Sequence, residues 1–427
     1  MVILWGALGG VVLLGCVGVG HGALGEQVLR GELAAAVKTY QTDFRDDEPA
    51  REDLAVAVLM QAARSEDTQE RREAFMQLSS LGVRAVDWLQ DLVEEPGPRA
   101  TKVMALGLLA DMGDVAAVGT LRELSHDLDP ELLPIAIAHL DAKTDRARLL
   151  GYVTADDAST RRAACKALRA LEGDREVIVA LSERLRLDPD ASVRARSLSS
   201  LAEVGGRTQP AIREALADDN QRVRFAALEL QLEVQDERAL EQVDQLLRGD
   251  ASELAVEAAR WVILNHMQIM VGAAKGLLER ALSAPLIATR SQAVVALRGL
   301  PASLLEEATR ARLEQEGDAS VRLQLALRHM PSDAARKVLV DLESSASKSV
   351  ALEAAVELAA VGDKESLDKV LAARADEHAS LRARASRALA QNLHQSEAVI
   401  ELLADNNVAV RCATARALLA GESAERT

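Results

Sequence analysis

Hydrophobic residues recur at helical spacing in short blocks along almost the whole chain, and residues 190–205 show the pattern most clearly. Asp190 stands where a residue that caps a helix is expected. Val193, Leu198 and Leu201 follow at spacings that place them on one face of a helix. The block therefore predicts an amphipathic helix that buries this face against other helices.

The same block returns about every 31 residues, a period typical of stacked helical pairs. Each copy is aligned on the position of Arg194, which mostly follows an apolar residue or Thr and precedes apolar or small residues four and seven positions later. We call the residue at this position the anchor of its repeat. Roughly twelve copies are found in this way. The anchors are Arg71, Lys102, Leu133, Arg161, Arg194, Arg224, Ala255, Arg290, Arg322, Ala351, Arg382 and Arg411.

A second amphipathic segment lies between consecutive anchored helices, as at residues 175–187, 239–247 and 365–373. An acidic or small polar residue precedes most anchors and can cap the anchored helix. One unit is therefore expected to be a helix, a short turn and a second, capped helix. The acidic residues are Asp67, Asp129, Asp157, Asp219, Asp250, Asp318, Glu377 and Asp405.

The order Asp, two residues, Val-Arg, a helix rich in small residues and a final Leu-x-x-x-Gly resembles the HEAT repeat in its bacterial, bilin-lyase-type form. The resemblance extends over about residues 51–420. It implies an α-solenoid, a superhelix in which each helical pair contacts mainly its neighbours. Leu133, Ala255 and Ala351 depart from the pattern, because they lack the basic side chain.

The basic anchors are predicted to have a structural role. A cation in the first turn of a helix faces the positive end of the helix dipole, which costs about a few tenths of a kcal/mol unless the cation is paired. We expect the partner to be the capping acid four residues earlier or an acceptor in the adjacent repeat. The anchors would then form a row along one edge, with buried or half-buried guanidinium groups. The alternative is that part of the series forms an exposed ligand surface.

Composition and charge narrow the possibilities further. Hydrophobic residues make up 49% of the 427-residue chain but aromatic residues only 2%, so Ala, Leu and Val must form a core of closely packed helices. The formal net charge of −16 argues against a nucleic-acid partner, because phosphates are bound by basic residues. If the surface is selective at all, this charge favours basic partners.

An uncharged apolar run occupies residues 2–24. It is long enough to cross a bilayer as a helix, although its glycines lower its hydrophobicity. Residues 13–16, Leu-Leu-Gly-Cys, also resemble a bacterial lipobox, which would make Cys16 a lipidated residue. A transmembrane anchor, a lipoprotein signal and a cleaved signal all remain open for residues 1–25, and no Lys or Arg precedes the run. The first two alternatives predict a protein at a membrane of the bacterial cell envelope.

Residues 26–53 are expected to form a short amphipathic helix and an acidic linker, because residues 41–53 combine acidic side chains with Pro49. The solenoid is assigned to residues 54–420. Residues 421–427 are expected to be a polar tail.

The anchor spacing is longest after Ala255, where residues 266–283 hold the extra length. Insertions in repeat proteins can mark a change of curvature or a contact site. Met267, Ile269 and Met270 are therefore the local candidate for contact with a partner. The alternative is an ordinary buried helix of greater length.

The sequence contains no recognised catalytic or cofactor-binding motif. Its seven histidines lack metal-ligand spacing, and no phosphate-binding glycine loop or nucleophile-elbow serine is present. Cys165 and Cys412 lie in repeat helices and are expected to be small core residues. We therefore predict no catalytic, metal-binding or cofactor-binding residue.

Two classes of function remain. The first is a membrane-tethered, non-catalytic scaffold that holds another protein on the face formed by the second helix of each pair. The second is an enzyme accessory or a lyase-like HEAT protein, since such repeats also occur in bilin lyases and beside catalytic domains. No domain outside the repeats supports catalysis, so the scaffold is the preferred hypothesis.

Overall fold

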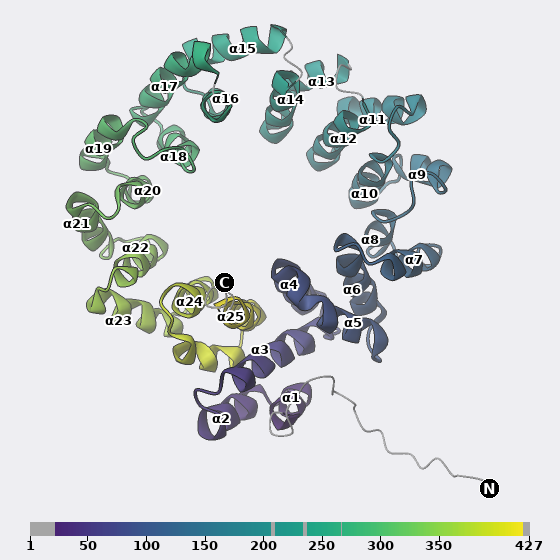
Figure 1. Ribbon diagram of the computed structural model, residues 1–427, viewed down its shortest axis with the longest axis vertical. Coiled ribbons are helices and arrows are strands. Elements are labelled where there is room, and N and C mark those ends of the chain that lie inside the picture. Colours follow the sequence, from purple (N-terminus) through teal and green to yellow (C-terminus); the bar gives the residue numbers. More distant parts are fainter. Residues whose placement is uncertain (1–21, 206–209, 234–236, 266, 422–427) are drawn as a thin grey trace. The chain divides into compact units, whose positions relative to one another are not determined.

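All regular elements in the described part of the chain are helices, which confirms the expected all-α fold (Figure 1). The chain divides into two compact units. Unit 1 comprises Met1–Thr101 and Ala359–Thr427, and unit 2 comprises Lys102–Leu358. The computed structural model describes residues 22–205, 210–233, 237–265 and 267–421.

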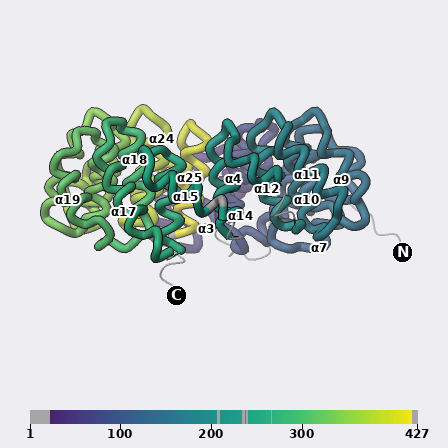
Figure 2. The backbone as a smooth tube through the Cα atoms, turned by 90° about the horizontal axis from the view of Figure 1, so that it is seen from above, coloured from purple at the N-terminus to yellow at the C-terminus, as the bar shows by residue number. Residues whose placement is uncertain are grey.

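The helices of unit 2 follow one another as antiparallel pairs, and the second helix of each pair carries the anchor (Figure 2). In Figure 1 the anchored helices of this unit lie on the concave side of a curved stack. The helices are α6 (Arg99–Asp111), α7 (Val115–Leu124), α8 (Leu133–Ile137), α9 (Arg146–Tyr152), α10 (Ala158–Leu168), α11 (Arg175–Leu187), α12 (Ala191–Glu203), α13 (Pro210–Glu214), η2 (Ala215–Ala217), α14 (Gln221–Glu233), α15 (Glu237–Arg248), α16 (Glu253–Leu264), α17 (Gln268–Leu282), α18 (Ile287–Ala296), α19 (Glu306–Gln315), α20 (Ala319–His329), α21 (Asp333–Leu342) and α22 (Lys348–Ala360).

Unit 1 contains helices from both ends of the chain. Together with unit 2 they make twelve described pairs, from α3 with α4 to η5 with α25. The elements of unit 1 are α1 (Gly22–Leu29), α2 (Leu33–Asp43), α3 (Glu48–Ala63), α4 (Thr68–Leu81), η1 (Gly82–Ala85), α5 (Val86–Glu94), α23 (Lys364–Ala372), η3 (Ala373–Ala375), α24 (Ala379–Arg387), the π-helical turn η4 (Ala388–Asn392), η5 (Ser396–Ala404) and α25 (Val408–Gly421).

Most anchored helices begin at a capping residue four positions before the anchor. In α12 the Asp190 carboxylate accepts hydrogen bonds from the backbone N–H groups of Ser192 at 2.8 Å and Val193 at 3.2 Å. Such a cap contributes about 1 kcal/mol to helix stability. Gly205, with φ of 90°, then supplies the left-handed residue that ends the helix. The same capping role belongs to Asp67, Asp157, Asn220, Asp318 and Asn407.

The core is a continuous layer of small and branched side chains. Val193, Leu198 and Leu201 are fully buried, as their helical spacing predicts. They belong to a cluster of buried residues between Ile137 and Ala227, and a second cluster follows in the remaining repeats of unit 2. Because these side chains are small, neighbouring helices approach closely and every repeat depends on its neighbours for burial.

The prediction of an acidic linker at residues 41–53 is wrong for most of these residues. Helix α2 extends to Asp43 and α3 begins at Glu48, so only four residues between them lie outside helices. The carboxylate of Asp47 caps α3 by accepting a hydrogen bond from the Ala50 N–H at 3.0 Å, and Pro49 occupies the first turn, where proline needs no donor. Acidic residues and proline here start a helix instead of interrupting one.

The expected anchor or lipoprotein signal lies almost wholly outside the described residues, and so does Cys16. Only its last residues are described, in α1, where Leu24 is fully buried. Among the described helices, none is both long enough and apolar enough to cross a membrane. The polar tail also lies beyond the described residues, apart from Gly421 at the end of α25.

Unit 1 brings the first and last repeats of the chain into direct contact. Helices α3 and α4 both pack against α25, and α2 packs against η5. The buried Tyr40 donates a hydrogen bond from its hydroxyl to Oε1 of Glu397 at 2.6 Å, and Arg51 donates to the same atom at 3.0 Å. The final repeat is therefore covered by the N-terminal helices.

Glu397→Ala is expected to destabilise unit 1 by about 1–3 kcal/mol, because the buried Tyr40 hydroxyl loses its acceptor. Hydrogen exchange of the α2 and α3 amides, measured with urea unfolding, checks this. The control is Glu365→Ala, which removes an 81% exposed carboxylate from a surface pair and should change stability by less than about 1 kcal/mol. Unchanged protection of α2 and α3 in Glu397→Ala would contradict the interface.

Candidate functional site

Most of the arginine anchors make the same contact within their own repeat. The Nη1 atom donates hydrogen bonds to the two backbone carbonyls five and six residues earlier, at 2.7 to 3.3 Å. These carbonyls belong to the turn that joins the two helices of the pair, so the anchor holds that turn against its helix. The residues with this geometry are Arg71, Arg161, Arg194, Arg224, Arg290, Arg382 and Arg411.

Four of these arginines also reach a carboxylate in the next repeat. In each pair Nε and Nη2 donate to the two oxygens of one carboxylate, the bidentate geometry that gives strong and directional pairing. The carboxylate always stands six residues before the anchor of its own repeat. We call these contacts the arginine ladder. Its pairs are Arg161 with Asp188 at 2.8 and 2.8 Å, Arg194 with Asp218 at 2.8 and 2.8 Å, Arg290 with Glu316 at 2.8 and 2.9 Å, and Arg382 with Asp405 at 2.7 and 2.8 Å.

The ladder carboxylates are charged although they are buried. The side chains of Asp188 and Glu316 have no exposed surface. Burial alone raises the pKa of Glu316, but hydrogen bonds from Arg290, from the Asp318 N–H and from Arg312 outweigh it and lower the pKa to about 2. The same balance holds the pKa of Asp188 below its usual range. Each pair is therefore an ion pair in the folded protein.

The expected alternative partner, the capping acid of the same helix, has another role. Asp157 accepts from the N–H and hydroxyl of Thr160 at 2.7 and 2.9 Å, and Asp190 accepts from the first turn of α12. The other expected partner, an acceptor in the adjacent repeat, is the one found, but the sequence did not identify which acid it is, because the acid stands 23 to 27 residues from its arginine. An acid that recurs at this distance after an arginine anchor is the signal that could have identified it.

The remaining anchors lack one half of the ladder contact. Arg224 holds only its own turn, and Gly249 stands where the next repeat would carry the acid. Arg322 pairs instead with the exposed Asp341 at 2.8 Å. Ala255 is buried without a charge. Other contacts join the repeats at such positions besides packing, including a hydrogen bond from Nη2 of Arg280 to the Leu247 carbonyl at 2.8 Å. Lys102, Leu133 and Ala351 are half-buried.

In unit 1 the last anchor finds its carboxylate in the first repeat. Nη2 of Arg411 donates to Oε1 of Glu70 at 3.1 Å, although Glu70 directly precedes an anchor and does not stand six residues before it. Nε of Arg416 donates to the Ser80 hydroxyl at 3.1 Å. The arginine contact between successive repeats is thus continued between the two ends of the chain.

The structure separates the three residues expected to contact a partner. Ile269 is 98% exposed, whereas Met267 and Met270 are half-buried against the core of unit 2. The extra length of this repeat lies in α17, which has 15 residues and buries Leu277 and Leu278. Of the three residues, Ile269 alone offers a fully exposed apolar side chain, and its contact with a partner stays a prediction.

The described cysteines are unsuited to nucleophilic chemistry. Burial raises the pKa of the Cys165 thiol to about 11 and that of Cys412 to about 12. Both are therefore neutral at physiological pH, and the Ser197 hydroxyl lies 3.3 Å from Sγ of Cys165 in the neighbouring helix.

One group of potential metal ligands occurs in the described residues, at Asp376, Glu377 and His378. Glu377 and His378 are exposed, and the His378 ring lies 2.9 Å from Oδ1 of Asp376. The backbone carbonyls of the two acids accept hydrogen bonds from Arg382. The segment is therefore the turn that the arginine anchor Arg382 holds against its helix.

Arg161→Met is expected to cost about 3–5 kcal/mol of unfolding free energy, because the buried Asp188 loses its bidentate partner and keeps only Arg184, 3.7 Å away, as a cation. Adding Asp188→Leu should recover most of the loss. The matched control is Arg186→Met, which breaks an equally bidentate pair between repeats, with Glu214, whose side chains are 39% and 57% exposed. That variant should lose less than about 1 kcal/mol in urea unfolding. Equal losses in the two single variants would show that burial does not govern the ladder.

Acid should weaken the ladder in a defined pH range. The folded pKa of Glu316, about 2, lies below its unfolded value near 4.3, so its stabilisation of about 3 kcal/mol is fully present above the unfolded pKa. This stabilisation is lost as the pH falls from about 4.5 to about 2. Glu316→Gln should flatten the decline of stability in this range, whereas Glu365→Gln should leave it unchanged. Equal slopes in wild type and Glu316→Gln would contradict the lowered pKa.

Comparison with known proteins identifies the repeats. Residues 178–263 match a family model described as HEAT repeats, and this segment includes Asp188, Arg194 and Asp218 of the ladder. No curated protein matches the chain. A crystal structure of an engineered protein aligns with 86% of this chain and 98% of its own at 18% identity, but its TM-score of 0.26 supports no structural argument. Residues 178–263 are therefore assigned as HEAT repeats, and helical pairs with the same anchor contacts continue on both sides of this segment.

Proposed function

We propose that this protein is a non-catalytic scaffold that binds a partner protein along its anchored helices. The observation that carries the proposal is a row of open positions five residues after the anchors of five consecutive repeats. The arginine anchors hold the repeats together, whereas the residues of this row keep solvent-accessible surface. The row consists of Lys166, Ser199, Glu229, Arg260 and Val295.

The row changes its chemistry from helix to helix. Neighbouring helices are separated by about 8–10 Å, so the row extends over several helix spacings on the concave side of unit 2. Along the row the side chains are basic, small polar, acidic, basic and apolar. A partner whose side chains follow the complementary order would be selected by this row. An extended surface of this kind is typical of binding by helical repeats.

The N-terminal run supports a position at a membrane. Residues 2–24 are apolar and uncharged, and residues 13–16 resemble a lipobox. We infer that this segment tethers the repeats to a membrane of the bacterial cell envelope, either as a transmembrane helix or through a lipid on Cys16. Intact-mass analysis of protein extracted from its own membranes distinguishes the two, because lipidation at Cys16 removes the first 15 residues.

Partner binding on the concave side can be tested by photo-crosslinking in living cells. A crosslinking residue at Ser199, which lies in the row, should capture a protein, whereas the same residue at Val179 of α11, which is 56% exposed, should not. Capture from both positions, or from Val179 alone, would overturn the assignment of the face. Turnover of a small molecule by the purified chain, without capture from either position, would favour the enzyme-accessory alternative.

A further inference from the structure

Two neighbouring anchored helices of unit 2 carry an excess of positive charge, although the net charge of the chain is −16. Helix α10 and the residue after it contain Arg162, Lys166 and Arg169 at spacings of four and three, in addition to the anchor, and no acidic residue. These spacings place the three cations on one face of the helix. Helix α12 adds Arg196, and its only acidic residue is Glu203. The adjacent open faces of α10 and α12 therefore carry four cations and one carboxylate.

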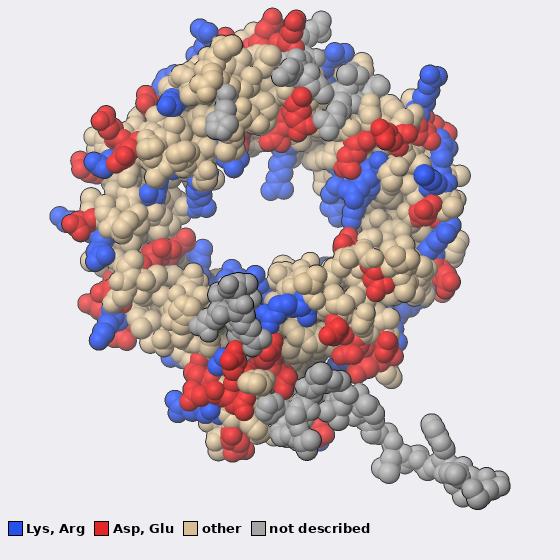
Figure 3. Space-filling view, viewed as in Figure 1, with Lys and Arg blue, Asp and Glu red and all other residues tan. Residues whose placement is uncertain are grey.

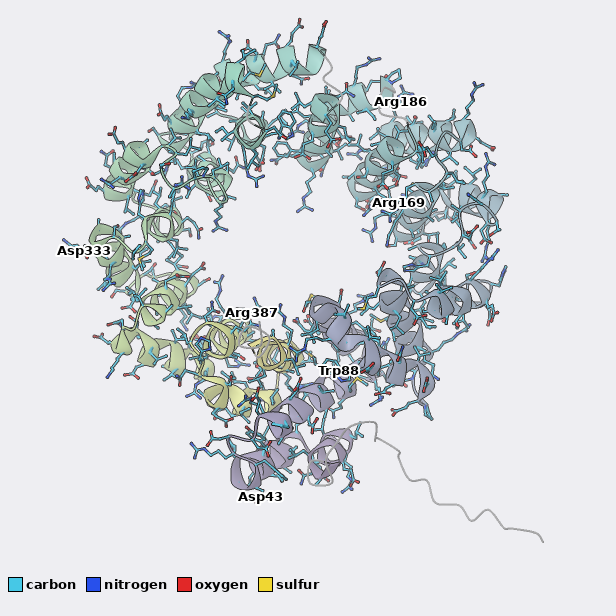
Figure 4. The ribbon with its side chains drawn as sticks, viewed as in Figure 1. Asp43, Trp88, Arg169, Arg186, Asp333 and Arg387 are labelled. Carbon is cyan, nitrogen blue, oxygen red and sulfur yellow. The ribbon has the colours of Figure 1, made fainter. Side chains whose placement is uncertain are left out.

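These cations lie on the side of the helices that faces away from the core. The residues between them in α10 are almost all buried, whereas Arg162 and Arg169 are exposed and Lys166 is half-buried. Helices α10 and α12 pack against each other, so their open faces adjoin. Figure 3 shows Lys and Arg atoms gathered at this concave edge. Figure 4 places Arg169 on this side of unit 2 and Arg186 toward the convex side.

Two of the four cations have weak or shared partners. Nζ of Lys166 lies 3.2 Å from Oδ1 of Asp111 at the end of α6, and Nη1 of Arg169 lies 3.8 Å from Oε1 of Glu203. Asp111 also lies 3.6 Å from the His139 ring. The side chains of these pairs are 31% to 54% exposed, and pairs that solvent reaches contribute little to stability.

Arg162 and Arg196 have no hydrogen-bond or ion-pair partner among the described residues. Their situation contrasts with that of the adjacent anchors, because Arg161 and Arg194 form buried bidentate pairs. Folding therefore does not use these two guanidinium groups. An arginine on an open helix face keeps its bidentate donors available for a carboxylate from another molecule.

The borders of this face limit what it can hold. The next anchored helix, α14, carries Glu229 and Glu233 on its exposed surface, and α16 follows with Glu257. Partial burial raises the pKa of Glu229 although its side chain keeps exposed surface, and the nearby Glu257 raises it further. The charged residues thus change from basic to acidic within one helix spacing. Between the cations α12 presents small residues, including Ser199, so an extended backbone can approach the helix.

We propose that the open face of α10 and α12 binds an acidic peptide segment of the partner protein, with two or three carboxylates paired to Arg162, Arg196 and Arg169. This inference rests on the proposed scaffold function and names the chemistry of the partner. It differs from the expectation drawn from the net charge, which favoured basic partners. Charges are screened beyond about 8 Å at physiological ionic strength, so the local excess outweighs the distant acidic residues.

A peptide fits this face better than a nucleic acid does. A nucleic acid carries a phosphate at every nucleotide and needs a basic surface along its whole contact. Here a strand that left α12 in the direction of α14 would meet Glu229 and Glu233 after one helix spacing. A short acidic segment ends before that border.

The test is fluorescence anisotropy with the full chain and a fluorescein-labelled peptide of about nine residues that carries three glutamates. The glutamine counterpart of the peptide serves as the uncharged probe. The variant Arg162→Glu/Arg196→Glu should weaken binding of the acidic peptide roughly tenfold or more, because two charge-assisted pairs are lost. The uncharged peptide should bind weakly to both proteins. Salt at about 0.5 M should also weaken the binding of the acidic peptide.

The matched control is Arg175→Glu/Lys143→Glu, which makes the same change in net charge at two exposed residues outside the α10–α12 face. It should retain the affinity of the wild type within about twofold. The comparison then distinguishes the effect of contacts on the α10–α12 face from the effect of net charge on affinity. Thermal unfolding should show that both variants fold. If charge reversal disturbs the fold, Arg162→Gln/Arg196→Gln gives the same comparison without new repulsion.

Three outcomes would overturn the proposal. They are equal affinity of the wild type and the Arg162/Arg196 variants for the acidic peptide, absence of binding to the acidic peptide, and tighter, variant-sensitive binding of a single-stranded oligonucleotide of equal charge. Failure of the proposed function is recognised separately by the crosslinking from Ser199. Capture of a protein there that survives Arg162→Glu/Arg196→Glu would keep the scaffold and reject the pairing of these arginines with carboxylates of the partner.

Discussion

The contact that fixes four of the junctions between repeats is the buried ion pair between an arginine anchor and a carboxylate of the next repeat. Burying one of these charges alone would be strongly destabilising, so each partner requires the other at a fixed place. The same guanidinium group also holds the turn of its own pair. One side chain thus couples the shape of a repeat to the position of its neighbour, and it does so where small apolar residues leave little other means of fixing the register.

The ends of a helical stack normally leave an apolar face without a neighbour, and repeat proteins cover such faces with polar terminal repeats. In unit 1 the two ends cover each other. Helices α3 and α4 pack against α25, and Glu397 receives hydrogen bonds from Tyr40 and Arg51 of the N-terminal helices. Contacts that span more than 340 residues of sequence therefore contribute to a fold whose other contacts are mostly local.

Adjacent arginines in α10 illustrate how position decides the role of one residue type. Arg161 lies at the junction between repeats and forms an ion pair with the buried carboxylate of Asp188. Arg162 lies on the open face and has no partner among the described residues. The net charge of the chain predicts the role of neither arginine. A scaffold built in this way can vary the residues of its open faces without disturbing the ladder, because no hydrogen bond or ion pair joins the two sets among the described residues.

The sequence by itself determined the helical pairs, because the apolar spacing, the capping residues such as Asp190 and the recurrence of the anchor are local properties of the chain. It also predicted that the arginine anchors need acceptors. Only the tertiary structure decided which acceptors they take, since Asp188 and Arg161 are brought together by packing and not by helical spacing. The contact of α25 with α3 could likewise not be predicted from the sequence, because no local pattern indicates which distant helices pack together. Residues 41–53 misled for a related reason: the acid and proline that suggest a linker also start a helix when a core is available to bury it.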